Sequence, residues 1–534
     1  MSLYHRFLLD TQRDYSFAGY LTNITTYVIK ANWQFGVIAV NDCIGNSAYM
    51  ELILSNAGGE FTLDDTSALY YGKIRTGTLI RVQMSQNNST WTNMATLKIR
   101  EINPNYSMDG AHSLTIKASD ILQDFLNQDY IPPLQTNIRV DNALRALHNT
   151  RAAIWPYESY YQFIGHTSIG DGKAPFYGAD WVDFETAETT LDYLGDNLGK
   201  EQKLVVQQYI RSCVEAEIFG LYYFSPRSEK FEFLSRYHAA DTAVSWNVTE
   251  AITGIPKFTY GRDFVNDYAL GYFPRDVGTA NSVLWQSDNV PFSIPARSTK
   301  RLTIKYRDPN NESASVGALL VNDPVKGTDI IFNTLSDGSG AANLNDKIDI
   351  TLIKGAASSE LIISNLRRRD QTWITFLRIT GTPITAYNKE IAYGYNDGSL
   401  FGSGSDETSG NDRKSGSDTL AAISDPDFAQ SYADFRVNVF GQPQQVIEKI
   451  TIPIKDTDTV TQAQVLTRTI GDVINVTISV LDHNTDYMIV GEMHSVTGAN
   501  ERQHTVSYLL RPTNTSALFI LDTSNSNAGD TLSF

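Results

Sequence analysis

A strict alternation of apolar and polar residues marks positions 470–511. Ile474, Val476 and Ile478 are apolar and polar residues separate them, which is typical of a strand with one buried face. Apolar positions return over 487–496 and, after a turn at 497–500, through Val506 to Leu510. Three strands joined by short turns predict an antiparallel meander near the C-terminus.

The same alternation occurs near the N-terminus in three further runs. Its apolar positions are Ile80, Val82 and Met84, then Ala95, Leu97 and Ile99, and then Leu114, Ile116 and Ala118. We therefore expect two small sheet or barrel units, a β-barrel domain over residues 1–130 and another over residues 446–534.

Residues 131–250 are predicted to form a mixed α+β domain. Helices are expected after a Ser119-Asp120 cap, around 140–147, from Glu185 through Leu191 and Leu194, and over 201–219, which would be the longest helix. Residues 149–180 are rich in Tyr, Gly and Trp without a clear period, so an irregular segment is expected there. A strand pair is predicted at 220–224 and 230–234.

The next part of the chain is predicted to carry an inserted domain. Residues 251–282 read as connecting strands, and residues 283–381 contain repeated short strands with turns between them, which predicts a β-sandwich. Residues 382–445 form a second connecting segment, with a flexible Gly- and Ser-rich loop at 402–417 and a helix that begins at Pro426. The fold class expected is mainly β with a few helices, in several domains.

Charge and cysteine content exclude several classes of function and of site. The chain has 534 residues and a formal net charge of −17, so we expect three or four domains and no specific binding of nucleic acid. Its two cysteines, Cys43 and Cys213, are too few for a disulfide framework or a zinc site. Because no stretch approaches the roughly 18 apolar residues of a membrane span, a soluble protein of a reducing compartment is expected.

Candidate chemistry is sparse, and we predict no catalytic, cofactor-binding or metal-binding residues. His483, His494 and His504 are expected in a loop, a strand and a strand margin, without a metal-binding motif. The carboxylate pairs Asp64/Asp65 and Asp456/Asp458 could serve glycoside hydrolysis but are typical of solvated turns. Two alternatives stay open: a calcium site in the Asp- and Asn-rich turns, and a sugar-stacking or docking surface along residues 155–181.

Short phrases of the chain resemble one family. Residues 261–268 (Gly-Arg-Asp-Phe-Val-Asn-Asp-Tyr), followed by Tyr272-Phe273-Pro274-Arg275, resemble the hub or minor tail proteins at the distal tip of tailed bacteriophages. Further phrases that fit this family are Val283-Leu284-Trp285, Tyr306-Arg307-Asp308-Pro309, Gly338-Ser339-Gly340, residues 379–384, Gly471-Asp472 and residues 487–490.

The resemblance implies a structural virion protein rather than an enzyme. In such hubs, two similar β-barrels from each of three subunits form a six-fold-like ring that closes the tail tube, connects it to the adhesion apparatus and lets DNA pass. It implies a homotrimer at the virion tail tip, assembled in the host cytoplasm. Its partners would be the tail tube or distal tail protein, the tape-measure protein, and tail fibre or receptor-binding proteins. A receptor- or carbohydrate-binding tail protein that uses the sandwich is the first alternative, and a secreted glycan-active enzyme is the second.

Overall fold

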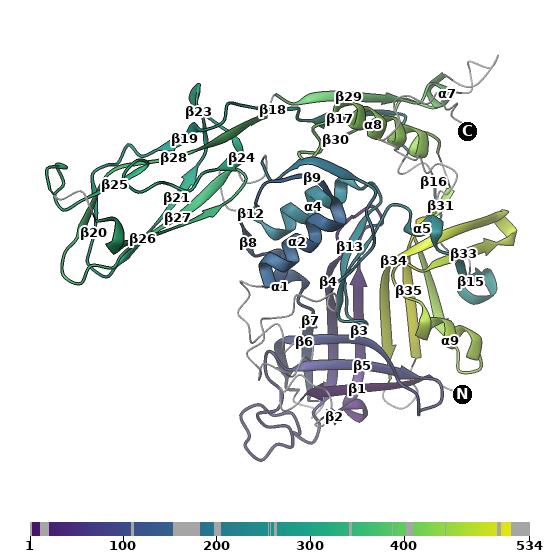
Figure 1. Ribbon diagram of the computed structural model, residues 1–534. Helices are drawn as coiled ribbons and strands as arrows, with labels where there is room; N and C mark the ends of the chain where they lie inside the picture. The colour runs from purple at the N-terminus through teal and green to yellow at the C-terminus, as the bar shows by residue number, and fades with distance from the viewer. Residues whose placement is uncertain are drawn as a thin grey trace.

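A computed structural model gives the fold (Figure 1). It describes residues 3–10, 21–107, 112–152, 182–196, 204–254, 256, 258–260, 264–340, 344–386, 388–401, 410–443, 445–498 and 503–513. Most of the predicted irregular segment 149–180, the aromatic stretch up to Trp181, residues 261–263 of the resemblance and residues 402–409 of the predicted loop lie outside these ranges.

The largest sheet of the described chain has 12 strands and draws on both ends of the sequence. Its N-terminal strands are β1 (Tyr4–Asp10), β2 (Leu21–Asn23), β3 (Val28–Gly36), β4 (Asn46–Ser55), β5 (Leu79–Ser85), β6 (Thr92–Asn105) and β7 (Ser113–Ser119), with the short helix η1 (Thr25–Tyr27). Its other strands are β15 (Val244–Thr249), β32 (Lys449–Ile454), β33 (Val473–Ile478), β34 (His483–Thr497) and β35 (Gln503–Pro512), with α9 (Thr459–Thr467) and η4 (Ser479–Leu481) between them.

Strand β3 joins the two predicted β units. It pairs with β4 on one side and with β34 on the other, where Lys30 lies opposite Thr497 and Gly36 opposite Gly491. The predicted mainly β, multidomain fold class is confirmed. Instead of two separate barrels, however, the described strands form one open sheet, because the edges of β3 and β34 pair with each other across the two units.

The middle of the chain packs several short elements against this sheet. They are α1 (Leu122–Leu126), β8 (Asp129–Tyr130), β9 (Gln135–Arg139), α2 (Val140–Ala152), β10 (Val182–Phe184), β11 (Thr190–Leu194), β12 (Leu204–Val205), α4 (Val206–Ala216), β13 (Leu221–Ser225), β14 (Lys230–Leu234), α5 (His238–Asp241) and α6 (Glu250–Thr253). Residues from α1, α2, α4, β13 and β14 share one apolar core.

Two helix predictions in this part are wrong. The helix expected from Glu185 is strand β11, in which Leu191 lies opposite Ile138 and Leu194 opposite Gln135 of β9. Cross-strand pairing of two leucines three positions apart overrides the helical spacing that the sequence suggests. The helix expected over 201–219 is the 11-residue α4, and the 15-residue α8 is the longest helix described.

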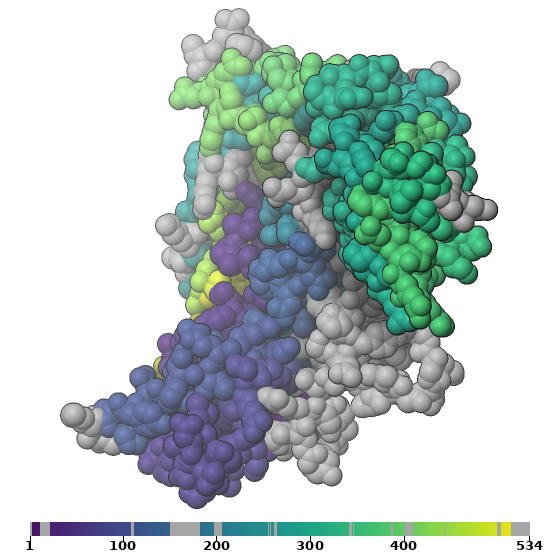
Figure 2. All heavy atoms as spheres, turned by 90° about the vertical axis from the view of Figure 1, so that its left-hand side faces the viewer, coloured from purple at the N-terminus to yellow at the C-terminus, as the bar shows by residue number. Residues whose placement is uncertain are grey.

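Residues 282–386 form a two-layered β-sandwich that reaches away from the rest of the chain (Figure 1), and Figure 2 shows it from that side, in front of other modules. Its elements are β19 (Ser282–Gln286), β20 (Phe292–Ile294), β21 (Thr299–Lys305), β22 (Arg307–Asp308), β23 (Asn311–Ser315), β24 (Gly317–Val321), β25 (Ile330–Asn333), η2 (Asn345–Lys347), β26 (Ile348–Lys354), β27 (Ser358–Asn365) and β28 (Thr372–Ala386). One layer is ordered β21-β27-β26, and the long β28 organises the other. Side chains such as Leu361 from the first layer and Leu377 from the second meet in a core of their own.

A smaller sheet with a helix connects the sandwich to the rest. Its three strands are β17 (Asp267–Tyr272), β29 (Glu390–Tyr395) and β30 (Ser415–Thr419), and the helix α8 (Pro426–Phe440) packs against β17 and β29. In the same part of the chain, β16 (Phe258–Tyr260) pairs with β31 (Gln445–Ile447), β18 (Arg275–Val277) pairs with β28 of the sandwich, and α7 (Asp397–Phe401) follows β29. As predicted, α8 begins at Pro426, where Asp425 accepts a hydrogen bond from the amide of Asp427 at 2.8 Å.

The predicted flexible loop 402–417 is partly a strand. Its last residues belong to β30, which runs parallel to β17 with Ser415 opposite Asp267. The backbone of β17 offers hydrogen bonds at this edge, so a polar segment pairs there without burying apolar side chains. Within the described residues, no helix is long and apolar enough to cross a membrane.

Candidate functional site

The seam between β3 and β34 produces one polar face across both β units. Rows of side chains cross it from strand to strand, because successive residues of a strand alternate between the two faces. One row runs through Pro453, Thr505, Ser495, Asn32, Glu51, Lys117 and Glu101, and the next through Thr451, Ser507, Met493, Gln34, Tyr49, Ser119 and Lys98. A depression of about 390 Å³ lies in this face over β3, β34 and β35.

Charges on this polar face have both signs. Lys117 Nζ lies 2.9 Å from Glu101 Oε2, which neutralises one of the lysines locally. Glu51 and Lys98 are further charged residues of the two rows. Several other positions hold uncharged hydrogen-bonding groups: Ser495 Oγ donates to Asn32 Oδ1 at 2.8 Å, and the hydroxyls of Thr451 and Ser507 lie 2.9 Å apart. The face therefore presents hydroxyl and amide groups over most of its width.

The opposite face of the same seam buries a chain of polar groups that we call the buried relay: Arg227, Glu492, His494, His504 and His5. Glu492 Oε1 accepts hydrogen bonds from both Arg227 Nη2 and His494 Nε2. His494 Nδ1 lies 2.9 Å from His504 Nε2, and His504 Nδ1 lies 3.4 Å from His5 Nε2. The relay thus links β1, β34, β35 and the turn between β13 and β14.

Donor and acceptor roles run in one direction along the buried relay. Because Glu492 accepts from Nε2 of His494, the Nδ1 atom of a neutral His494 must accept, and His504 Nε2 must donate to it. The same reasoning makes His504 Nδ1 the acceptor for His5 Nε2. An added proton would place two N–H groups against each other, so each link favours neutral imidazoles.

Burial and charge shift the pKa values of the relay consistently with this order. Burial lowers the pKa of His494 although Glu492 opposes the shift, and burial with the neighbouring histidines holds the pKa of His504 well below its ordinary value. Burial alone would raise the pKa of Glu492, but Arg227 and the hydrogen bonds it accepts outweigh burial and lower it. Glu492 is therefore ionised and paired, with Trp33 stacked on His494 at 4.5 Å between ring centres.

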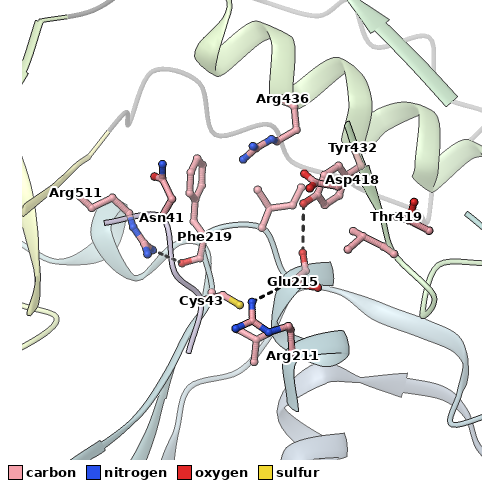
Figure 3. A pocket seen from close by; sticks show the side chains of 14 residues that line it. Asn41, Cys43, Arg211, Glu215, Phe219, Asp418, Thr419, Tyr432, Arg436 and Arg511 are labelled. Carbon is pink, nitrogen blue, oxygen red and sulfur yellow. Dashed lines mark hydrogen bonds and ion pairs between the residues drawn. The ribbon is translucent and has the colours of Figure 1, made fainter. Parts of the chain in front are cut away.

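A second feature is a cavity of about 360 Å³ where α4, α8, β30 and the end of β35 meet (Figure 3). Arg511 is buried there and donates to the carbonyls of Val40 (3.0 Å), Phe219 (3.0 Å) and Asp42 (2.9 Å). Burial lowers its pKa to about 10, and burial raises the pKa of the Cys43 thiol to about 11. That thiol is protonated and unreactive at neutral pH, so this cavity ties modules together rather than offering a nucleophile.

The candidate residues from the sequence have structural roles here. Asp65 accepts from the amide of Ser67 at 2.9 Å in an exposed turn, and Asp458 caps α9 through the amide of Thr461 at 2.9 Å. His483 is the first residue of β34 rather than a loop residue, and its Nε2 lies 3.1 Å from the Tyr487 hydroxyl. Among the described residues, no group of three or more His, Cys, Asp and Glu could hold a metal ion.

The sequence pattern did not identify the buried relay, although the strand positions of two of its histidines indicated that they are buried. His504 has the same parity as the inward-facing Val506 and Tyr508, and His494 lies opposite Trp33 and Val506. A histidine on the apolar face of an alternating strand requires a buried polar partner. The partners His5 and Arg227 come from distant parts of the chain, so no local pattern identifies them.

No family model and no curated protein matches the chain. Among solved structures, a 43 kDa tail protein of prophage MuSo2 from Shewanella oneidensis is similar, with 8% identity, coverage of 96% of this chain and 100% of that one, and a TM-score of 0.45. A tail protein from Neisseria meningitidis MC58 has 9% identity, coverage of 96% and 97%, and a TM-score of 0.43. Prophage tail protein gp18 from Listeria monocytogenes EGD-e has 7% identity, coverage of 96% and 95%, and a TM-score of 0.40. All three are named as tail proteins, two of them from prophages.

Proposed function

We propose that the chain is a structural subunit of a bacteriophage tail tip, in which three copies form a hub ring and the polar face lines its bore. The observation that carries this proposal is the unbroken sheet across both β units, with one continuous polar face. Two units in each of three chains would supply six β units to a six-fold tube, which is the arrangement that the family resemblance implies.

The chemistry of the face suits a passage for DNA. A bore ringed by lysine and arginine would hold phosphates through counterion release and slow their movement. Hydroxyl and amide rows with paired charges, such as Lys117 with Glu101, offer no continuous cationic track. The ring would contact the tail tube or distal tail protein, the tape-measure protein and the fibre or receptor-binding proteins, at a tail tip assembled in the host cytoplasm.

Native mass measurement and an image of the assembled particle test the arrangement. We expect three copies of the chain with the β3–β34 seam toward the bore. A monomer within the particle, or a bore formed by another face, would contradict the proposal.

A functional test adds cations to the face. Thr505→Arg with Thr497→Arg places two guanidinium groups on it, and Val480→Arg, at a residue 68% exposed on η4, is the control. We expect all variants to assemble and only the face variant to eject DNA more slowly. Equal ejection rates for the two variants would argue against this face as the lining of the bore.

A further inference from the structure

In the part of the chain that the structure describes, the β-sandwich is attached to the other modules at one end. At the attached end, the amide of Ala356 donates to Pro132 O at 2.7 Å, and Arg275, opposite Ala386 of β28, pairs with Asp196 at 2.8 Å. Strand β28 runs from Thr372 at the opposite end back toward this attachment. Figure 1 shows that opposite end, near β20 and the start of β26, far from the other modules.

Three loops meet at the free end, and two of them are held together by Asn365, which is 1% exposed. Its Nδ2 donates to the carbonyls of Ile294 (3.0 Å), Pro295 (3.1 Å) and Asp370 (3.1 Å), while its Oδ1 accepts from the amide of Arg367 at 3.0 Å. The amide of Leu366 also donates to Lys347 O at 2.9 Å. We call the described residues of these loops, 295–298, 334–340 with 344–347, and 366–371, the distal tip.

The distal tip presents cations that the rest of the protein does not use. Arg297, Lys347, Arg368 and Arg369 are exposed, and their side chains make no ion pair or hydrogen bond with any described residue. By contrast, Arg367 is bound internally to Asp370 at 2.7 Å. Residues 283–381 contain 12 Lys and Arg and 10 Asp and Glu, which gives this segment a net charge of +2, whereas the net charge of the whole chain is −17.

Two large apolar side chains lie on the same loops. Leu366 is 59% exposed and directly precedes the three arginines, and Leu335 is 52% exposed on the neighbouring loop. Register places both at this end, because Asn333 lies opposite Trp373 and Asn365 opposite Ile348. Exposed leucines beside basic residues are the combination with which peripheral proteins enter the headgroup region of an anionic bilayer.

We propose that the distal tip binds an anionic lipid bilayer. Arg297, Lys347, Arg368 and Arg369 contact headgroup phosphates, and Leu335 and Leu366 enter the interfacial layer. Nucleic acid would satisfy the cations but not the leucines. A fluid bilayer accepts both kinds of side chain on a projecting loop end without a shaped partner surface. The inference concerns the sandwich alone and does not depend on the ring proposed above.

Cosedimentation of the full chain with lipid vesicles tests the proposal. We expect binding to vesicles that contain phosphatidylglycerol and none to vesicles of phosphatidylcholine. A cation near an anionic surface contributes a factor of about five to partitioning, so Arg368→Gln with Arg369→Gln should lower binding by about 25-fold. The matched control, Lys305→Gln with Lys354→Gln, removes two cations near the attached end and should leave binding unchanged.

A second variant separates insertion from charge attraction. Leu335→Ser with Leu366→Ser should abolish the part of vesicle binding that persists in high salt, because screening removes only the electrostatic part. Thermal unfolding of each variant verifies that these exposed substitutions leave the fold intact. Absence of binding to phosphatidylglycerol vesicles, or full binding by the arginine variant, would overturn the proposal. Equal affinity for soluble poly-glutamate with no effect of the leucine variant would assign the distal tip to an acidic protein instead.

Discussion

Replacement of Glu492 by glutamine tests the buried relay most directly. The substitution keeps the shape of the side chain and removes its charge. Arg227 then loses its carboxylate partner and keeps the bond from Nη1 to Leu466 O at 3.1 Å. Because both Arg227 Nη2 and His494 Nε2 donate to Oε1 of Glu492, the single oxygen of a glutamine amide can accept both bonds, with its NH₂ group in the place of Oε2, but it carries no charge to pair with Arg227.

The expected loss of stability follows from burial. The side chain of Glu492 is fully buried and that of Arg227 is 11% exposed, so water cannot replace the lost partner. Removing one member of a buried ion pair costs about 3–5 kcal/mol. Because glutamine can still accept both hydrogen bonds and loses only the charge, we expect a value at the lower end of this range, about 3 kcal/mol, for Glu492→Gln. Arg227→Met with Glu492→Met removes both charges and should stay within about 1 kcal/mol of the wild type.

Urea unfolding followed by Trp33 fluorescence measures this difference. The ring of Trp33 stacks on His494 with an interplanar angle of 7°, so its emission reports the relay. The chain contains seven tryptophans, and subtraction of a Trp33→Phe spectrum isolates the signal. A local reporter is required because a chain of several modules need not unfold in one step. A Glu492→Gln variant as stable as the wild type, or a double variant less stable than the single one, would refute the reasoning.

Three further predictions concern the buried histidines, the seam between β3 and β34, and the sandwich. The pKa values of His494 and His504 are lower in the folded than in the unfolded protein, so their contribution to stability is present above about pH 6.5 and is lost as the pH falls below it. We therefore expect the thermal midpoint of the Trp33 signal to decrease when the pH is lowered from about 7 to about 5. The decrease should be smaller in His504→Gln. Gly36→Ala should destabilise the seam by at least about 2 kcal/mol in urea unfolding, since Gly36 has φ +90° and a Cβ there would lie 2.5 Å from Val490 O. Residues 283–381 should unfold cooperatively in calorimetry as an isolated fragment, because they have their own core and Gly381 pairs with the adjoining Ser282.

The alternation of apolar and polar residues predicted the strands well, because this pattern depends only on neighbouring residues in the sequence. Ile474, Val476 and Ile478 form the buried positions of β33, as their alternation indicated. The short strand β11 was misread because leucines three positions apart suit a helix face as well as a strand that pairs with β9. Only the presence of a partner strand distinguishes the strand from the helix, and the local sequence does not show which strand is the partner.

The relay and the seam show why the site itself could not be predicted. His5 and His504 are 499 positions apart, and Arg227 and Glu492 are 265 apart. Alternation tells which face of a strand is buried but not which strands lie side by side. The polar positions of β3 and β34 were therefore visible as separate stripes, and their union into one face required the pairing of the two strands.

The buried relay also has a consequence for the register of the seam. A slip of β34 against β3 by one residue would turn His494 to the polar face, away from Trp33, and bring Ser495 into the core. Apolar packing alone penalises such a slip weakly where the facing residues are small, whereas the relay can close only in the native register. We therefore expect Arg227→Met with Glu492→Met to keep its stability but to exchange the backbone amides of β3 faster than the wild type in hydrogen exchange. Unchanged protection of β3 in that variant would show that backbone pairing and apolar packing fix the register without the buried charges.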